Sequence, residues 1–196
     1  MESLYNNAKF IFEQNKSLPN LEVELRLGKK NTNMFATNIG EKKFLKIKQA
    51  LDNFNGWEKV ETSNISSYFL KNIRYNVNDD TDASETIIKK KIKHFDQVLP
   101  DQPLDIRFAI AQEIPQPEPD LDNVEMDFMR CKSRTSYIRK NLSIDLTIVN
   151  GQPEDMDDEY DNSYEVELEI IDPTKVTNDK TFYNIIYKVF CILKTL

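Results

Sequence analysis

Apolar residues recur along this chain with two different periods, which predict helices near its ends and strands through its middle. Three segments place apolar residues every three or four positions and are expected to form helices, at 2–16, 41–54 and 179–194. Other segments alternate or are β-branched, and we expect strands at about 21–28, 56–64, 67–77, 85–94, 104–113, 129–139, 142–149 and 163–171. This pattern indicates an α+β fold dominated by antiparallel strands.

The polar positions of the predicted strands carry an unusual amount of charge. Successive side chains of a strand point to opposite faces, so charges two residues apart share a face. The first and last strands carry Glu22, Glu24, Arg26, Glu165, Glu167 and Glu169 on such faces. The middle strands carry Arg74, Lys89, Lys91, Lys93, Arg107, Arg130, Lys132 and Arg134, with Glu113 and Asp145. The segment at 85–94 permits either parity, and its lysines face this way only if Ile88 and Ile92 pack on the apolar side.

Two architectures explain this alternation. An open antiparallel sheet with one solvated side would show it, and for any single strand that is the simpler interpretation. Eight such strands can instead close into a barrel whose apolar face lies outward beneath the amphipathic helices, with a charged interior. Clustered carboxylates repel unless solvent or a cation relieves them, and hard divalent cations prefer oxygen ligands. A barrel of this kind could therefore bind a metal-bound polyphosphate, with arginine and lysine on the anionic oxygens.

Composition narrows the class of protein. A chain of 196 residues with 39% hydrophobic residues is long enough for one sizeable core, and we expect a single domain. The net charge of −7 argues against wrapping of long nucleic acid but allows a local basic pocket. We expect no membrane span, an intracellular location, and no zinc site or disulfide framework from Cys131 and Cys191. The acidic run at 154–161 and the proline-rich run at 115–119 are predicted to be loops.

The ordered set of charged strands resembles a known family. Glu22-x-Glu24 in the first strand and Glu165-x-Glu167-x-Glu169 in the last resemble the glutamate signatures of the triphosphate tunnel metalloenzymes. Within that superfamily the chain is most similar to the metal-dependent RNA triphosphatases of fungal and large-DNA-virus capping systems, especially the triphosphatase domains of mimivirus-like mRNA capping enzymes. Segments 105–113, 130–137 and 143–147 resemble that family's water-orienting, basic and aspartate-bearing strands. Arg26 stands where tunnel enzymes for small triphosphates commonly carry lysine.

The resemblance implies an eight-stranded antiparallel tunnel barrel with helices outside and Mg²⁺ or Mn²⁺ as cofactor. It implies metal binding by Glu22, Glu24, Glu167 and Glu169, supported by Glu165, Asp145 and Arg26. Catalytic roles fall to Glu113, Arg74, Lys132 and Arg134, with Glu113 orienting the attacking water and the cations gripping the γ-phosphate. Substrate contacts are expected from Lys89, Lys91, Arg107 and Arg130.

The implied activity is a polynucleotide 5′-phosphatase that removes the γ-phosphate of 5′-triphosphate RNA, the first step of mRNA capping. Hydrolysis of nucleoside triphosphates could accompany it. One alternative is a tunnel phosphatase for small triphosphates or inorganic polyphosphate; another is a polyanion-binding module without turnover, which would not require so many carboxylates. The resemblance further implies that residues 1–196 are the N-terminal part of a larger capping enzyme with guanylyltransferase and methyltransferase modules. It implies a location in the host cytoplasm, at viral factories, or in the virion.

Overall fold

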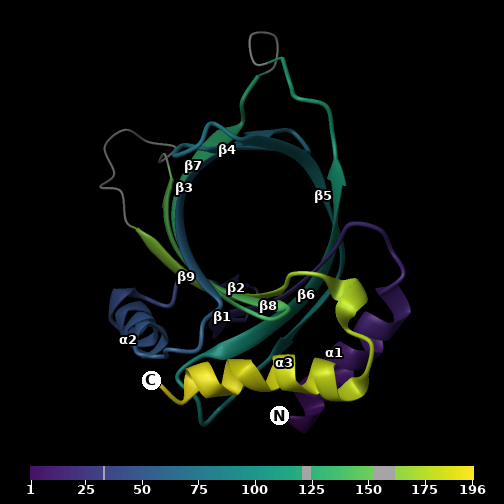
Figure 1. Cartoon of the computed structure of the whole chain (residues 1–196), viewed down its shortest axis with the longest axis vertical. Helices are drawn as coiled ribbons and strands as arrows, with labels where there is room; N and C mark the ends of the chain where they lie inside the picture. The colour runs from purple at the N-terminus through teal and green to yellow at the C-terminus, as the bar shows by residue number, and fades with distance from the viewer. Residues whose placement is uncertain (33, 121–124, 152–161) are drawn as a thin grey trace.

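Eight antiparallel strands close into a barrel in the computed structural model, which describes residues 1–32, 34–120, 125–151 and 162–196. The barrel strands are β1 (Leu21–Lys30), β3 (Lys59–Leu70), β4 (Ile73–Asn78), β5 (Ser84–Gln97), β6 (Asp105–Pro115), β7 (Phe128–Arg139), β8 (Leu142–Gly151) and β9 (Ser163–Ile170). Their order is β1-β6-β5-β4-β3-β7-β8-β9, and β9 pairs with β1 to close the ring (Figure 1). The predicted fold class is confirmed, and the open sheet is excluded.

Three helices lie outside the ring on one side, as the periodicity predicted: α1 (Glu2–Asn15), α2 (Glu41–Asp52) and α3 (Asp179–Leu193). The structure adds a two-residue strand β2 (Phe35–Ala36) on the edge of β1 and a short 3-10 helix at Pro173–Lys175. Among the described residues, no helix is long and apolar enough to cross a membrane. The acidic run at 154–161 lies outside the described residues.

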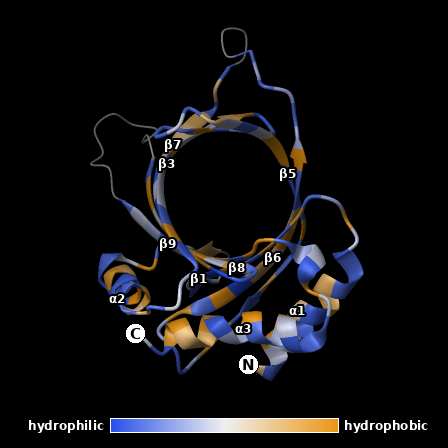
Figure 2. Cartoon of the chain, viewed as in Figure 1, coloured by the Kyte–Doolittle hydropathy of each residue, from blue (hydrophilic) through white to orange (hydrophobic). Residues whose placement is uncertain are grey.

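The hydrophobic core lies between the outer face of the barrel and the helices. Val23, Leu25 and Phe108 point outward from β1 and β6 and are fully buried beneath the helices. Phe12 of α1 stacks on Phe182 of α3, with ring centroids 4.8 Å apart. Burial of such apolar side chains contributes roughly 1.5–3 kcal/mol each, so the helices hold this half of the wall. In Figure 2 apolar positions lie on the helices and on the strands beneath them, and also on β5 and β7.

The wall formed by β3 and β4 carries no helix in Figure 1, and its sequence agrees with that exposure. Thr62, Asn64 and Ser66 point outward from β3, where a helix-covered strand would carry apolar residues. The two strands are joined by a two-residue turn in which Lys71 adopts a left-handed conformation with φ of 57°. The predicted boundary between strands 56–64 and 67–77 was therefore wrong: β3 runs without a break to Leu70.

Candidate active site

The inward side chains of the barrel line a cavity of about 410 Å³. Every strand of the barrel contributes to the lining. The lining includes Glu22, Glu24, Arg26, Arg74, Lys89, Glu113, Arg130, Lys132, Arg134, Glu165, Glu167 and Glu169. Twelve of the fifteen residues to which the resemblance assigns a site role thus meet in one tunnel, because period-two alternation turns each of them to the same side of its strand.

Glutamates from β1 and β9 form an acidic wall at the seam where the barrel closes. Glu24 is paired in register with Glu169, so carboxylates from the two ends of the sequence become neighbours on the inner face. On the other side of β1, Ala109 and Ala111 of β6 are opposite Glu24 and Glu22. The small side chains of these alanines take up little room beside the carboxylates.

Lys89 of β5 lies among the carboxylates of this wall. Its Nζ atom is 2.5 Å from Oε2 of Glu22, 3.9 Å from Oε1 of Glu24 and 3.8 Å from Oε1 of Glu113. The side chains of Lys89 and Glu22 are only 15% and 11% exposed. A single ammonium group therefore neutralises part of an acidic cluster that has little access to solvent.

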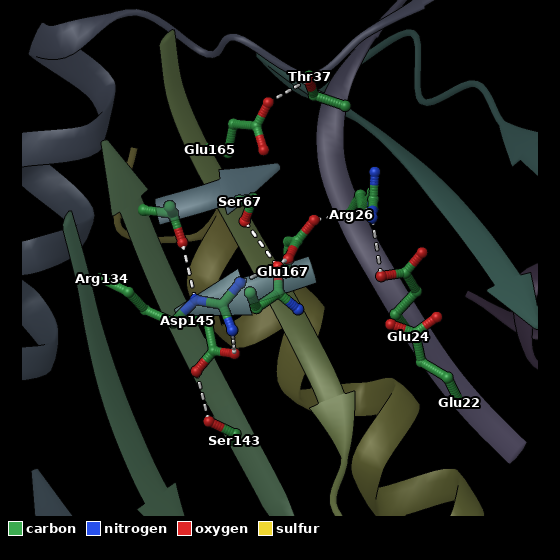
Figure 3. A network of polar contacts seen from close by, with 12 residues as sticks. Glu22, Glu24, Arg26, Thr37, Ser67, Arg134, Ser143, Asp145, Glu165 and Glu167 are labelled. Carbon is green, nitrogen blue, oxygen red and sulfur yellow. Dashed lines mark hydrogen bonds and ion pairs between the residues drawn. The ribbon is translucent and has the colours of Figure 1, made fainter. Parts of the chain in front are cut away.

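Arg26 is the second cation that pairs with carboxylates of the acidic wall (Figure 3). One guanidinium nitrogen donates to Oε2 of Glu24 at 3.0 Å, and Nε lies 2.8 Å from Oε1 of Glu167. Burial alone would raise the pKa of Glu167, but Arg26 and Arg134 more than offset it and the pKa is lowered. The carboxylate of Glu167 is therefore held in its charged form.

Two other carboxylates of the wall are not fully compensated. Burial raises the pKa of Glu22 despite the neighbouring Lys89. Burial, with repulsion from Glu22 and Asp145, raises the pKa of Glu169 to about 8. Within the described part of the chain, the side chain of Glu169 forms no hydrogen bond or ion pair. Burial without a partner disfavours the charged form of a carboxylate, and a bound cation would stabilise that form.

The opposite wall, built by β4 and β7, is basic, and of its four cations only Arg134 has acidic partners among the described residues. Among the described residues, Arg74, Arg130 and Lys132 form no ion pair, and the buried Nε of Arg74 has no hydrogen-bond acceptor. Burial, together with repulsion from Arg74 and Arg134, lowers the pKa of Lys132 to about 8. Cations this close without counter-charges favour binding of an anion between them.

Arg134 and Asp145 link the two walls (Figure 3). Arg134 donates from Nε to Oγ1 of Thr147 at 3.2 Å, and its other nitrogens lie 3.6 Å from Asp145 and 3.9 Å from Glu167. Asp145 is buried and accepts a hydrogen bond of 2.5 Å from Oγ of Ser143. These contacts fix the direction of the Arg134 guanidinium, which is required of a group that must meet a phosphate at a set position.

Two residues that were predicted to contact the substrate do not line the cavity. Lys91 is exposed and does not line the cavity, because β5 continues past the last pairing of β4, at Ile88, and bulges between Lys91 and Lys93. Arg107 faces the inner side but is held by Asp96, at 2.6 and 3.0 Å, and its guanidinium lies over the ring of Phe35. The structure thus places Lys91 and Arg107 outside the lining of the cavity, and their contact with the substrate stays a prediction.

Some lining residues were not predicted from the sequence. Phe69 lines the cavity beside Arg74, and Thr37 donates a hydrogen bond of 2.9 Å to Glu165 from the segment that follows β2. The aromatic residue gave no signal because a lone phenylalanine in a strand is typical of a core. The parity of β3 could have revealed it, had its continuous run to Leu70 been recognised.

The acidic wall offers the oxygen ligands that a hard cation prefers, but its carboxylates do not converge on one point. Within the described ranges, no group of three or more His, Cys, Asp or Glu side chains converges closely enough to hold an ion. Glu22 and Glu24 point instead to the ammonium of Lys89 and the guanidinium of Arg26. The oxygen-only donor set, the carboxylate of Glu169 and the small residues opposite fit a magnesium or manganese ion once Lys89 is displaced.

A closed eight-stranded barrel whose acidic and basic walls face each other defines a polyphosphate-binding tunnel protein. The chain belongs to the family described as mRNA capping enzyme, beta chain, whose sequence profile matches residues 48–184. No curated protein matches the sequence.

Solved structures agree with this assignment at the level of the fold. The structure of S. pombe Pct1 RNA triphosphatase has a TM-score of 0.82 at 16% identity, covering 97% of this chain and 93% of that chain. Pct1 in complex with the Spt5 CTD gives 0.85 at 15% identity, covering 97% and 95%. The mimivirus capping enzyme triphosphatase gives 0.60 at 20% identity, covering 95% and 96%.

Proposed function

We propose that this protein hydrolyses the γ-phosphate of 5′-triphosphate RNA in a reaction that depends on a divalent metal ion, and leaves a 5′-diphosphate end. The observation that carries the proposal is the division of charge inside the closed tunnel. Carboxylates on β1 and β9 face cations on β4 and β7 across a cavity of about 410 Å³. A triphosphate with a bound metal ion carries negative and positive charge together and so matches both walls. The family of this protein supports RNA as the molecule that carries the triphosphate.

The acidic wall supplies the ligands for the metal. Glu22, Glu24 and Glu169 would hold Mg²⁺ or Mn²⁺, and Glu167 and Asp145 would accept from its bound waters. When bound, the ion supplies positive charge that offsets the charge developing on the phosphate oxygens. Glu24 is 6% exposed and burial raises its pKa, so a cation gained there would meet little competition from solvent. Lys89 serves the same carboxylates in the absence of the ion.

The basic wall would bind both the γ-phosphate that is released and the phosphates that remain on the RNA. Arg74 and Lys132 have no counter-ion of their own, so an anion placed between them gains two charge-assisted contacts without breaking any ion pair among the described residues. Arg134, fixed by Thr147 and Asp145, presents a planar fork to the transferred phosphoryl group. Phosphoryl transfer depends mainly on such positioning and charge.

Glu113 is suited to direct the attacking water. It points inward from β6 two residues before that strand ends at Pro115, its side chain is 30% exposed, and its Oε1 is 3.8 Å from the Lys89 ammonium. A carboxylate there can accept a hydrogen bond from a water molecule on the side of the phosphate away from the leaving oxygen. The exposure of Glu113 distinguishes it from the buried carboxylates that are better placed to hold a cation.

Phosphate release from three substrates tests the proposal. Triphosphate-ended RNA, ATP and inorganic tripolyphosphate are compared with magnesium, with manganese and with chelator. We expect release from RNA with either metal and none with chelator. Release from tripolyphosphate alone would replace the proposal with a polyphosphatase function. Binding of all three without release would make the protein a polyanion-binding module.

A further inference from the structure

An aromatic pair lies at the rim of the tunnel, next to the basic wall. Phe69 of β3 and Phe128, the first residue of β7, are paired in register and stack with ring centroids 4.2 Å apart and planes inclined by 13°. Phe69 is half-buried and lines the cavity, whereas Phe128 is 43% exposed. A large apolar side chain this exposed at the mouth of a charged tunnel has no part in the core beneath the helices.

Two arginines flank the pair. The guanidinium of Arg74 lies 5.3 Å from the ring centroid of Phe69, and that of Arg130 lies 5.7 Å from Phe69 and 5.5 Å from Phe128. Neither arginine forms an ion pair within the described residues, so their charge is available to a ligand that also contacts the rings. Aromatic rings and guanidinium planes are the two side-chain surfaces on which nucleobases stack.

The order of residues along β7 matches the order of groups in a nucleotide. Phe128 at the rim is followed inward by Arg130, Lys132 and Arg134, each two residues further along the same face. A strand rises about 3.3 Å per residue, so these side chains succeed one another at intervals of roughly 7 Å. A terminal phosphate held by Lys132 and Arg134 would direct the following phosphates toward Arg130. The attached nucleoside would then reach the aromatic pair.

We propose that Phe69 and Phe128 form a stacking platform for the first nucleobase of the substrate, which makes the tunnel selective for nucleoside-linked triphosphates over inorganic polyphosphate. The inference deepens the proposed function and rests on it. Every base has a π face, so the platform accepts all four bases with little sequence preference. Inorganic tripolyphosphate has no ring and gains nothing from the pair.

Phe128→Ala tests the platform, with Phe10→Ala as the matched control. Phe10 is also an exposed phenylalanine, at 65%, but it lies on α1 outside the barrel. The specificity constant for triphosphate-ended RNA is measured beside that for tripolyphosphate. We expect the ratio of the two constants to fall on the order of tenfold in Phe128→Ala, the size of one lost base stack. The loss should lie in KM, and Phe128→Trp should restore the ratio.

Calorimetric binding of ADP and of pyrophosphate, each with manganese, gives a readout without turnover. The platform predicts weaker binding of ADP to Phe128→Ala than to wild type, with a much smaller change for pyrophosphate. Equal losses for both ligands would mean that the pair only supports the phosphate site, and no loss for ADP would mean that the rings are not used; either overturns the inference. Failure of the wild type to hydrolyse RNA would overturn the proposed function, and the ADP comparison would still decide the platform.

Discussion

Lys89 contacts the carboxylates that we assign to a divalent cation, so its removal tests the charge balance of the tunnel. Its Nζ atom is 2.5 Å from Glu22 and within 4 Å of Glu24 and Glu113. Lys89→Met keeps the apolar stem but leaves Glu22 buried without its partner. Breaking a buried ion pair in this way costs about 3–5 kcal/mol, and the solvent in the tunnel favours the lower end of that range.

Thermal unfolding in chelator and in manganese measures the effect. A loss of about 3 kcal/mol in a domain of this length lowers Tm by roughly 6–12 °C in chelator. In manganese the ion can take the place of the ammonium, and saturation at 100 times Kd returns about 2.7 kcal/mol. We therefore expect most of the Tm difference between variant and wild type to disappear in manganese.

The matched control is Lys48→Met on α2. Lys48 pairs with Asp52 at 2.8 Å, but both side chains are more than a third exposed, and such a pair contributes less than about 1 kcal/mol. Its small effect should be the same with and without metal. An equal fall of Tm for Lys89→Met in chelator and in manganese would refute the assignment of these carboxylates to a cation.

Three further predictions follow from single residues. Because a bound triphosphate favours protonated Lys132, whose pKa is about 8 in the free protein, KM should rise as pH increases through 8, and Lys132→Arg should remove this dependence. Tyr137 is fully buried, so Tyr137→Ala should lower the free energy of unfolding by about 3–5 kcal/mol in urea titrations. Gly28→Ala should also lower Tm, since its new Cβ would lie 2.3 Å from the carbonyl oxygen of Ala36 on β2.

Charge parity made the tunnel predictable from the sequence. Glu22 and Glu24 alternate with apolar residues, and Lys132 and Arg134 alternate with uncharged ones; period two assigns each pair to one face whatever strands lie beside it. Closure of the barrel followed from the need of three helices for an apolar surface outside it, together with the resemblance to a tunnel family. These features depend on local order along the chain, which a single sequence retains.

Features that depend on how neighbouring strands pair were not predicted from the sequence. The β3–β4 turn at Lys71 contains no glycine and gave no turn signal, so the strand boundary was placed too early. Lys91 does not line the tunnel because the pairing of β5 with β4 stops at Ile88, and the sequence of β5 alone does not show this. The stack of Phe69 on Phe128 joins residues far apart in the sequence, and their register is set by the whole sheet.

The most direct test of the tunnel as a metal-dependent active site is phosphate release from γ-labelled triphosphate RNA by wild type, Glu24→Gln and Glu13→Gln. Glu13 is an exposed glutamate on α1 and serves as the control. We predict metal-dependent release of orthophosphate by wild type and Glu13→Gln, with a diphosphate end on the RNA. Glu24→Gln should lose activity by orders of magnitude, on the scale of several kcal/mol of transition-state stabilisation. Near-normal release by Glu24→Gln, or release that persists in chelator, would contradict this account.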